Sequence, residues 1–209
     1  MSVWYLPSQS RWYQVTTLND VLEFWFPPGT RADAAHPEGQ FNLAWFQADP
    51  AFDDAIRRRF LPLFEQAAQG ALDGWAATAE GALALVVLLD QFPRNMFRGE
   101  ARSFATDGKA LAIARQAVSD GLDQRVPPLW RTFFYLPFEH SEDRAMQARS
   151  VSLFRALGNA ETTRFAETHR AIIDRFGRFP HRNVILGRES TPEEAEWLAA
   201  GGETFGTKT

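Results

Sequence analysis

The sequence predicts an all-α protein of about seven or eight helices, and three features support this fold class. Apolar residues recur at helical spacing, Pro and Gly residues stand between these stretches, and no stretch alternates convincingly between apolar and polar residues. Short turns between the helices favour antiparallel neighbours. We therefore expect packed helices and no sheet.

Capping residues and helix breakers define the elements in the first half of the chain. Each expected helix begins at a Thr or Asp and ends at a Pro or Gly. The expected helices are 17–26, 49–70, 78–92 and 107–121. The third is expected to stop before Pro93, because proline disfavours helical geometry in the residue that precedes it.

The same signals define the second half, with one ambiguity. The apolar stretch 129–138 is compatible with a helix or a buried strand, and its length and flanks leave the choice open. Ser141 is expected to open the next helix. Asn159 is expected to cap another, closed by Gly177. The last helix begins at a capping box that starts with Thr191.

Length and composition exclude several classes of protein. The 209 residues contain no low-complexity linker, so we expect one domain. The lack of cysteine excludes disulfides and thiolate chemistry, and a net charge of -4 disfavours nucleic-acid binding. No apolar run approaches the roughly 18 residues of a membrane span, and the N-terminus does not resemble a secretory signal. We expect a cytoplasmic protein that binds neither nucleic acid nor membrane.

Three short segments carry polar residues where the pattern predicts buried surface or rigid loops. Asp90 continues an apolar helical stripe, so its carboxylate is expected to need a buried partner. His140 lies between an aromatic segment and an acidic helix start, and the loop after Gly177 holds cations between aromatic and proline residues. The candidate ligand-binding residues are Asp90, Arg94, Asn95, Glu139, His140, Arg178, His181, Arg182 and Asn183.

Each of these signals also has a structural explanation. Asp90 can fix a local turn, and His140 can cap a helix or lie at the edge of the core. His169 falls on an apolar stripe, where a histidine is usually structural. Residues 164–188 hold six arginines against two acids, which favours an anionic ligand, but a general preference for Arg over Lys explains this too.

Three segments resemble, in order, motifs of the bacterial domain-of-unknown-function 924 family: LDQFPRN at 89–95, LPFEHSED at 136–143 and FGRFPHRN at 176–183. The resemblance covers residues 21–194, so residues 1–17 are expected to form an N-terminal extension and residues 18–209 a single domain. It implies a TPR-like stack of antiparallel helical hairpins. It implies no activity, and no catalytic residue follows from it.

Three functions remain open. A stack of hairpins offers a concave surface, where Arg94, Arg178 and Arg182 would bind a peptide or a small anionic molecule. Alternatively, the chain is a hydrolase that uses Asp and His residues for acid-base or metal chemistry, although the spacing matches no common metal motif. In the third hypothesis the polar residues form a purely structural network. We assign no metal ligand and no cofactor.

Overall fold

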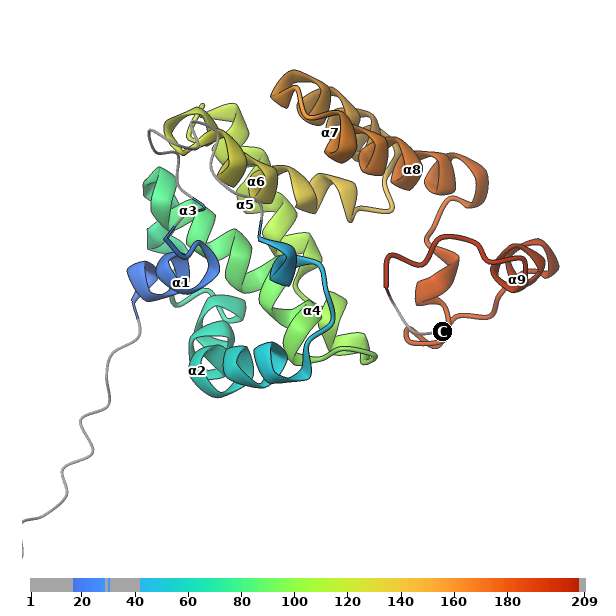
Figure 1. Ribbon diagram of the computed structural model, residues 1–209, viewed down its shortest axis with the longest axis horizontal. Coiled ribbons are helices and arrows are strands. Elements are labelled where there is room, and N and C mark those ends of the chain that lie inside the picture. Colours follow the sequence, from blue (N-terminus) through green and yellow to red (C-terminus); the bar gives the residue numbers. More distant parts are fainter. Residues whose placement is uncertain (1–16, 29, 31–41, 207–209) are drawn as a thin grey trace, which may run out of the picture.

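The computed structural model describes residues 17–28, 30 and 42–206, and these residues form helices joined by short turns (Figure 1). The α-helices are α1 (Leu18–Trp25), α2 (Pro50–Ala68), α3 (Ala79–Val86), α4 (Phe92–Met96), α5 (Asp107–Ser119), α6 (Pro128–Glu139), α7 (Arg144–Leu157), α8 (Ala160–Phe176) and α9 (Pro192–Ala199). No strand occurs in this part of the chain, so the predicted all-α class is confirmed. The regular stacking of a TPR-like fold stays a prediction.

A π turn joins α3 to α4 and changes the predicted helix boundary. Residues Val87–Gln91 form this π turn, and α4 continues directly from it. The expectation that the helix stops before Pro93 is therefore wrong. Pro93 has no N–H to donate to the Leu89 carbonyl one turn back, and Thr106 Oγ1 donates to that carbonyl instead at 2.5 Å. If α3, the π turn and α4 are counted as one continuous helix, the described residues form eight helices, which agrees with the predicted seven or eight.

Local capping signals were predicted correctly at most helix ends. Thr17 and Thr191 each form the two reciprocal hydrogen bonds of a capping box. Asn159 caps α8, and Gly177 ends it in a left-handed conformation with φ 72°. At α7 the prediction was wrong by two residues, because Asp143 and not Ser141 accepts the capping hydrogen bond from Met146 N.

Aromatic rings from three helices form the centre of the core. Trp25 of α1 contacts Phe92 of α4 at 5.5 Å between ring centroids and Phe133 of α6 at 5.7 Å. Phe133 lies in the stretch 129–138, which is helical. Burial of large rings on this scale is a major source of folding free energy. Helices α1, α4 and α6 therefore meet at one aromatic cluster.

A smaller apolar cluster lies in the C-terminal part of the chain. Ile172 and Ile173 of α8 pack there with Phe179, and the less buried Trp197 of α9 and Phe205 cover them. In Figure 1, α7 and α8 lie side by side and the segment after α8 folds back beneath them. This return brings the loop after Gly177 toward the helices of the main core.

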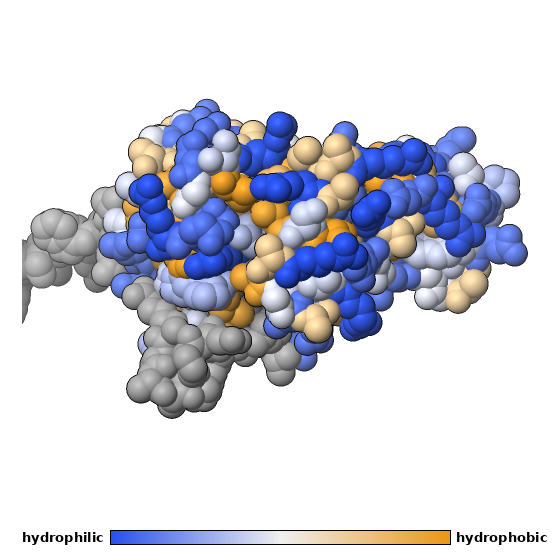
Figure 2. Space-filling view, turned by 90° about the horizontal axis from the view of Figure 1, so that it is seen from above, coloured by the Kyte–Doolittle hydropathy of each residue, from blue (hydrophilic) through white to orange (hydrophobic). Residues whose placement is uncertain are grey.

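The surface is mixed in polarity. Figure 2 shows one face on which hydrophilic side chains cover most of the area and smaller apolar areas lie between them. None of the helices within the described residues is long and apolar enough to cross a membrane.

Candidate functional site

Asp90 lies at the centre of a buried polar network. The π turn at Val87–Gln91 carries it, and its side chain is fully buried. Its carboxylate lies 2.7 Å from His140 Nδ1 and 3.2 Å from Arg94 Nη1, and it accepts a hydrogen bond of 2.5 Å from Gln91 Nε2. Burial alone would raise the pKa of Asp90, but Arg94 and His140 outweigh it and lower the pKa to about 2. The carboxylate is therefore charged at neutral pH.

Arg94 joins Asp90 to the start of α5. Its guanidinium donates two hydrogen bonds to Asp107, at 2.8 and 2.9 Å, in the forked geometry that arginine forms with a carboxylate. It also donates to the Asp90 main-chain carbonyl at 2.6 Å. Burial alone would lower the pKa of Arg94, but the nearby Asp107 and Asp90 raise it by more. The pKa of Arg94 therefore lies above that of a free arginine. Arg94 is thus a charged and fully paired cation.

His140 follows the last residue of α6 and presents one nitrogen to the network. Its Nδ1 faces Asp90, and no group among the described residues hydrogen-bonds its Nε2. Burial and the charge of Arg94 lower the pKa of His140 despite the opposing effect of Asp90, so the ring is neutral at neutral pH. Because the Asp90 carboxylate only accepts hydrogen bonds, the neutral ring carries its proton on Nδ1 and a lone pair on Nε2.

Arg182 approaches the same place from the C-terminal part of the chain. It ends the 3-10 turn Pro180–Arg182, and its guanidinium lies between the rings of Phe104, at 4.7 Å, and Phe179, at 4.4 Å. Its Nη1 is 3.6 Å from Asp107, and its buried Nε has no hydrogen-bond partner in the described structure. Burial and repulsion by Arg94 lower the pKa of Arg182 to about 10. The cation remains protonated but is poorly compensated.

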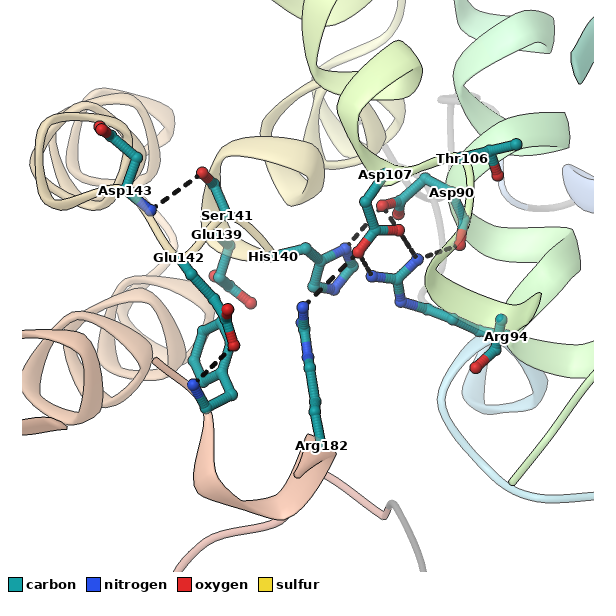
Figure 3. A network of polar contacts seen from close by, with 12 residues as sticks. Asp90, Arg94, Thr106, Asp107, Glu139, His140, Ser141, Glu142, Asp143 and Arg182 are labelled. Carbon is teal, nitrogen blue, oxygen red and sulfur yellow. Dashed lines mark hydrogen bonds and ion pairs between the residues drawn. The ribbon is translucent and has the colours of Figure 1, made fainter. Parts of the chain in front are cut away.

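His140 and Arg182 line a pocket of about 330 Å³, and Asp90 and Arg94 contact its lining residues His140 and Asp107 (Figure 3). The main core contributes one wall, the turn after α6 another, and the segment around Arg182 a third. The lining residues are Ala101, Phe104, Ala105, Asp107, Gly108, Leu111, Pro137, His140, Ser141, Glu142, Arg182 and Leu186. The pocket thus combines an apolar wall with a neutral imidazole, one cation and two carboxylates.

Glu142 holds the C-terminal segment against the pocket. It accepts two hydrogen bonds from Arg188, at 2.7 and 3.0 Å, and one from the main-chain N–H of Phe179 at 2.8 Å. Burial raises the pKa of Glu142, but Arg188 and the Phe179 N–H outweigh it, so the pKa is lowered. This arrangement fixes the segment that carries Arg182.

Three of these residues were not predicted from the sequence. Asp107 was interpreted only as a helix start, Glu142 as an ordinary first-turn acid, and Arg188 as part of an arginine-rich region. Partial signals existed for Glu142, which lies in the second motif, and for Arg188, which lies in the cationic segment. Nothing in the sequence indicated that Asp107 pairs with an arginine 13 residues away.

Two predicted site residues belong to a separate cluster. Arg178 donates two hydrogen bonds of 2.7 Å to Glu194, and Asn183 donates to the same carboxylate at 3.2 Å. Glu194 also accepts from the main-chain N–H of Thr191 at 2.7 Å, in the capping box of α9. Arg178 and Asn183 do not line the pocket. They attach α9 to the preceding loop.

Three other predicted residues also lie off the pocket. Asn95 of α4 donates to the main-chain carbonyl of Gln91 at 3.1 Å. Glu139 is buried 3.3 Å from His169, and burial together with Asp90 raises the pKa of Glu139 to about 8. His181 packs against Phe179, and burial and Arg182 lower its pKa to about 3. Of the predicted residues, only His140 and Arg182 line the pocket, while Asp90 and Arg94 contact the lining residues His140 and Asp107.

Metal binding gains no support from this arrangement. Within the described residues, no three His, Asp or Glu side chains are placed to hold one ion.

Comparison with known proteins identifies relatives without adding an activity. Residues 21–202 match the family described as bacterial protein of unknown function, DUF924. The chain also matches the solved structure of a protein of unknown function from Agrobacterium tumefaciens, with 46% sequence identity, a TM-score of 0.77, and coverage of 88% of this chain and 97% of the other. The curated proteins gave no match.

Proposed function

The chain belongs to the DUF924 family of bacterial proteins, and we propose, from the chemistry of its pocket, that it binds a small anionic molecule at Arg182. The pocket offers this cation beside a neutral imidazole and an apolar wall. A carboxylate or a phosphate group would supply the hydrogen-bond acceptors that the guanidinium lacks.

The incomplete pairing of Arg182 carries this proposal. Arg94, Arg178 and Arg188 each donate two hydrogen bonds of 2.7 to 3.0 Å to a carboxylate. Arg182 instead lies 3.6 Å from Asp107, a carboxylate that Arg94 already occupies. A buried charge without a close partner is costly, and an incoming anion would relieve that cost.

The dimensions of the pocket favour a small molecule over a peptide. A volume of about 330 Å³ is near the lower end, about 300 Å³, of the range for small-molecule sites. Phe104, Leu111 and Leu186 supply apolar contacts, which suit a ligand with a short carbon skeleton. Glu142 and Asp107 each have an arginine partner, so they repel an anion less than free carboxylates would.

Thermal shift measurements on the wild-type protein and an Arg182→Gln variant test the proposal. The ligands are inorganic phosphate, dicarboxylates, aromatic carboxylates and phosphorylated metabolites, with short neutral peptides for comparison. An anion at 100 times its Kd should stabilise the wild type by about 2.7 kcal/mol and leave Arg182→Gln unshifted.

Arg178→Gln is the matched control, because Arg178 lies on the same loop but pairs with Glu194 away from the pocket. This variant should lose stability and keep the full response to the anion. The proposal is wrong if no anion stabilises the wild type, or if Arg182→Gln responds as strongly as the wild type does.

A further inference from the structure

We propose that His140, positioned by Asp90, is a general base that activates water for attack on a carboxylic ester whose anionic group is bound by Arg182. This inference rests on the proposed anion site. It adds a reaction class and a substrate class to that site. His140 is the catalytic residue in this scheme, and Asp90 is a positioning residue.

The geometry of the Asp90–His140 pair supports a base directed into the pocket. The hydrogen bond of 2.7 Å between Asp90 and His140 Nδ1 fixes the ring, and Gln91 and Arg94 in turn hold the carboxylate. The ring lines the pocket together with Arg182, and in Figure 3 it lies between Asp90 and the Arg182 guanidinium. A carboxylate that orients an imidazole whose second nitrogen is free is the arrangement of a general base.

Burial and the charged groups of the neighbouring elements together determine the pKa of His140. Arg94 of α4 and Arg182 of the 3-10 turn are cations, and Asp90 of the π turn, Asp107 of α5 and Glu142 before α7 are anions. Glu139 of α6 precedes His140 in the chain, His181 of the 3-10 turn interacts with it electrostatically, and His169 of α8 has a ring centroid 6.3 Å away. Burial and Arg94 lower the pKa of His140, whereas Asp90 and Asp107 raise it, and the net effect is a lowered value. The neutral form, which a base requires, is present at neutral pH.

Water is the nucleophile in this scheme, because among the described residues no side-chain hydroxyl is hydrogen-bonded to His140. Ser141 also lines the pocket, but its hydroxyl accepts a hydrogen bond of 3.2 Å from Asp143 N, and among the described residues no hydrogen bond joins it to the His140 ring nitrogens. In the proposed step, His140 Nε2 takes a proton from water while the water oxygen forms a bond to the ester carbonyl carbon. The tetrahedral anion then expels the alkoxide, which takes the proton from His140, giving an acid and an alcohol.

The test uses 4-acetoxybenzoate, whose carboxylate is too far from the ester to catalyse its own hydrolysis, and phenyl acetate as its neutral counterpart. The wild type should release 4-hydroxybenzoate faster than buffer does, and kcat/KM should fall by about 100-fold or more in His140→Gln. The wild-type rate should fall as pH decreases through a single ionisation below 6.5, when His140 protonates. Arg182→Gln should raise KM for 4-acetoxybenzoate by a much larger factor than it changes KM for phenyl acetate.

Asp90→Asn tests the positioning role. It should reduce kcat more than it changes KM, and it should alter the pH profile, because an amide no longer selects the tautomer with the proton on Nδ1. Circular dichroism verifies that each variant is folded, and His140→Gln keeps the inference testable if Asp90→Asn does not fold.

Binding of 4-acetamidobenzoate, an amide analogue of low reactivity, separates the two proposals. If this analogue stabilises the wild type and not Arg182→Gln, while the wild type hydrolyses the ester no faster than His140→Gln, the catalytic inference is wrong and the anion site stands. If neither this analogue nor any other anion binds, both proposals are overturned. Hydrolysis that depends on His140 and on Arg182 supports both.

Discussion

Replacing Arg94 with Met would remove the cation at the centre of the polar network while keeping most of the side-chain volume. Asp107 would lose both of its hydrogen bonds from the guanidinium, and the fully buried Asp90 would lose its nearest cation. Asp90 would retain His140 and Gln91 as partners. The buried Asp90 carboxylate would therefore keep its hydrogen bonds but lose the charge that compensates its burial.

The magnitude follows from the burial of the pair. Removing one partner of a buried ion pair typically costs about 3–5 kcal/mol. A second measure comes from Asp90, because lowering its pKa from 3.8 to about 2 corresponds to about 2 kcal/mol of stability at neutral pH. His140 also contributes to that lowered value, whereas the hydrogen bonds to Asp107 add to the loss. We expect Arg94→Met to lower the free energy of unfolding by about 3 kcal/mol.

Urea denaturation at pH 7 measures this loss, and Arg98→Met is the matched control. Arg98 also donates two hydrogen bonds to an aspartate, Asp53, but its side chain is 35% exposed, so its removal should cost less than about 1 kcal/mol. The contribution of the lowered Asp90 pKa is present above pH 3.8 and is lost as pH falls toward 2. The difference between wild type and Arg94→Met should therefore shrink over that interval. A loss no greater than that of Arg98→Met would refute the reasoning.

Two further predictions concern the stability of the fold. Gly81→Ala should cost about 1–3 kcal/mol despite the higher helix propensity of Ala, because its Cβ would lie 2.1 Å from the main-chain oxygen of Trp75. Gly108→Ala meets no atom within 4 Å and should gain about 0.5 kcal/mol, and calorimetry of both variants would show opposite shifts in Tm. Arg178 lowers the pKa of Glu194 to about 2, so this stability is present above pH 4.5 and is lost as pH falls toward 2. Urea denaturation at pH 5 and pH 3 should show a smaller pH effect in Glu194→Gln, and an equal effect would contradict the assignment.

Helix boundaries were predictable from the sequence where a local hydrogen bond determines them. Thr17, Asn159 and Thr191 cap their helices through main-chain N–H groups two or three residues away, so a short sequence pattern contains all the necessary information. Pro93 shows the limit of this approach. Proline favours the end of a helix at the preceding residue. In the buried segment around Pro93, however, a π turn joins α3 to α4 and the helix continues.

The candidate site was predictable only in part, because its pairings depend on tertiary packing. Asp90 was identifiable because a carboxylate on an apolar stripe signals a buried charge. Its partner His140 lies 50 residues away, and no local rule specifies that pairing. Arg178 and Arg182 are close in sequence, but the 3-10 turn between them directs one to Glu194 and the other to the pocket.

The difference between these arginines decides whether Arg182 belongs to a structural network or to the proposed anion site. A network that serves only packing pairs each of its buried charges, as Arg178 and Arg188 are paired with Glu194 and Glu142. Arg182 departs from this rule, since its neighbouring carboxylate already binds another arginine. Replacing a cation that is buried and poorly compensated removes an unfavourable charge, which offsets the loss of its contacts with Phe104 and Phe179. Arg182→Gln should therefore cost less stability than Arg94→Met in the absence of ligand. A large decrease in Tm in that variant would instead show that Arg182 stabilises the fold. The proposal that the pocket binds an anion would then lose its main support.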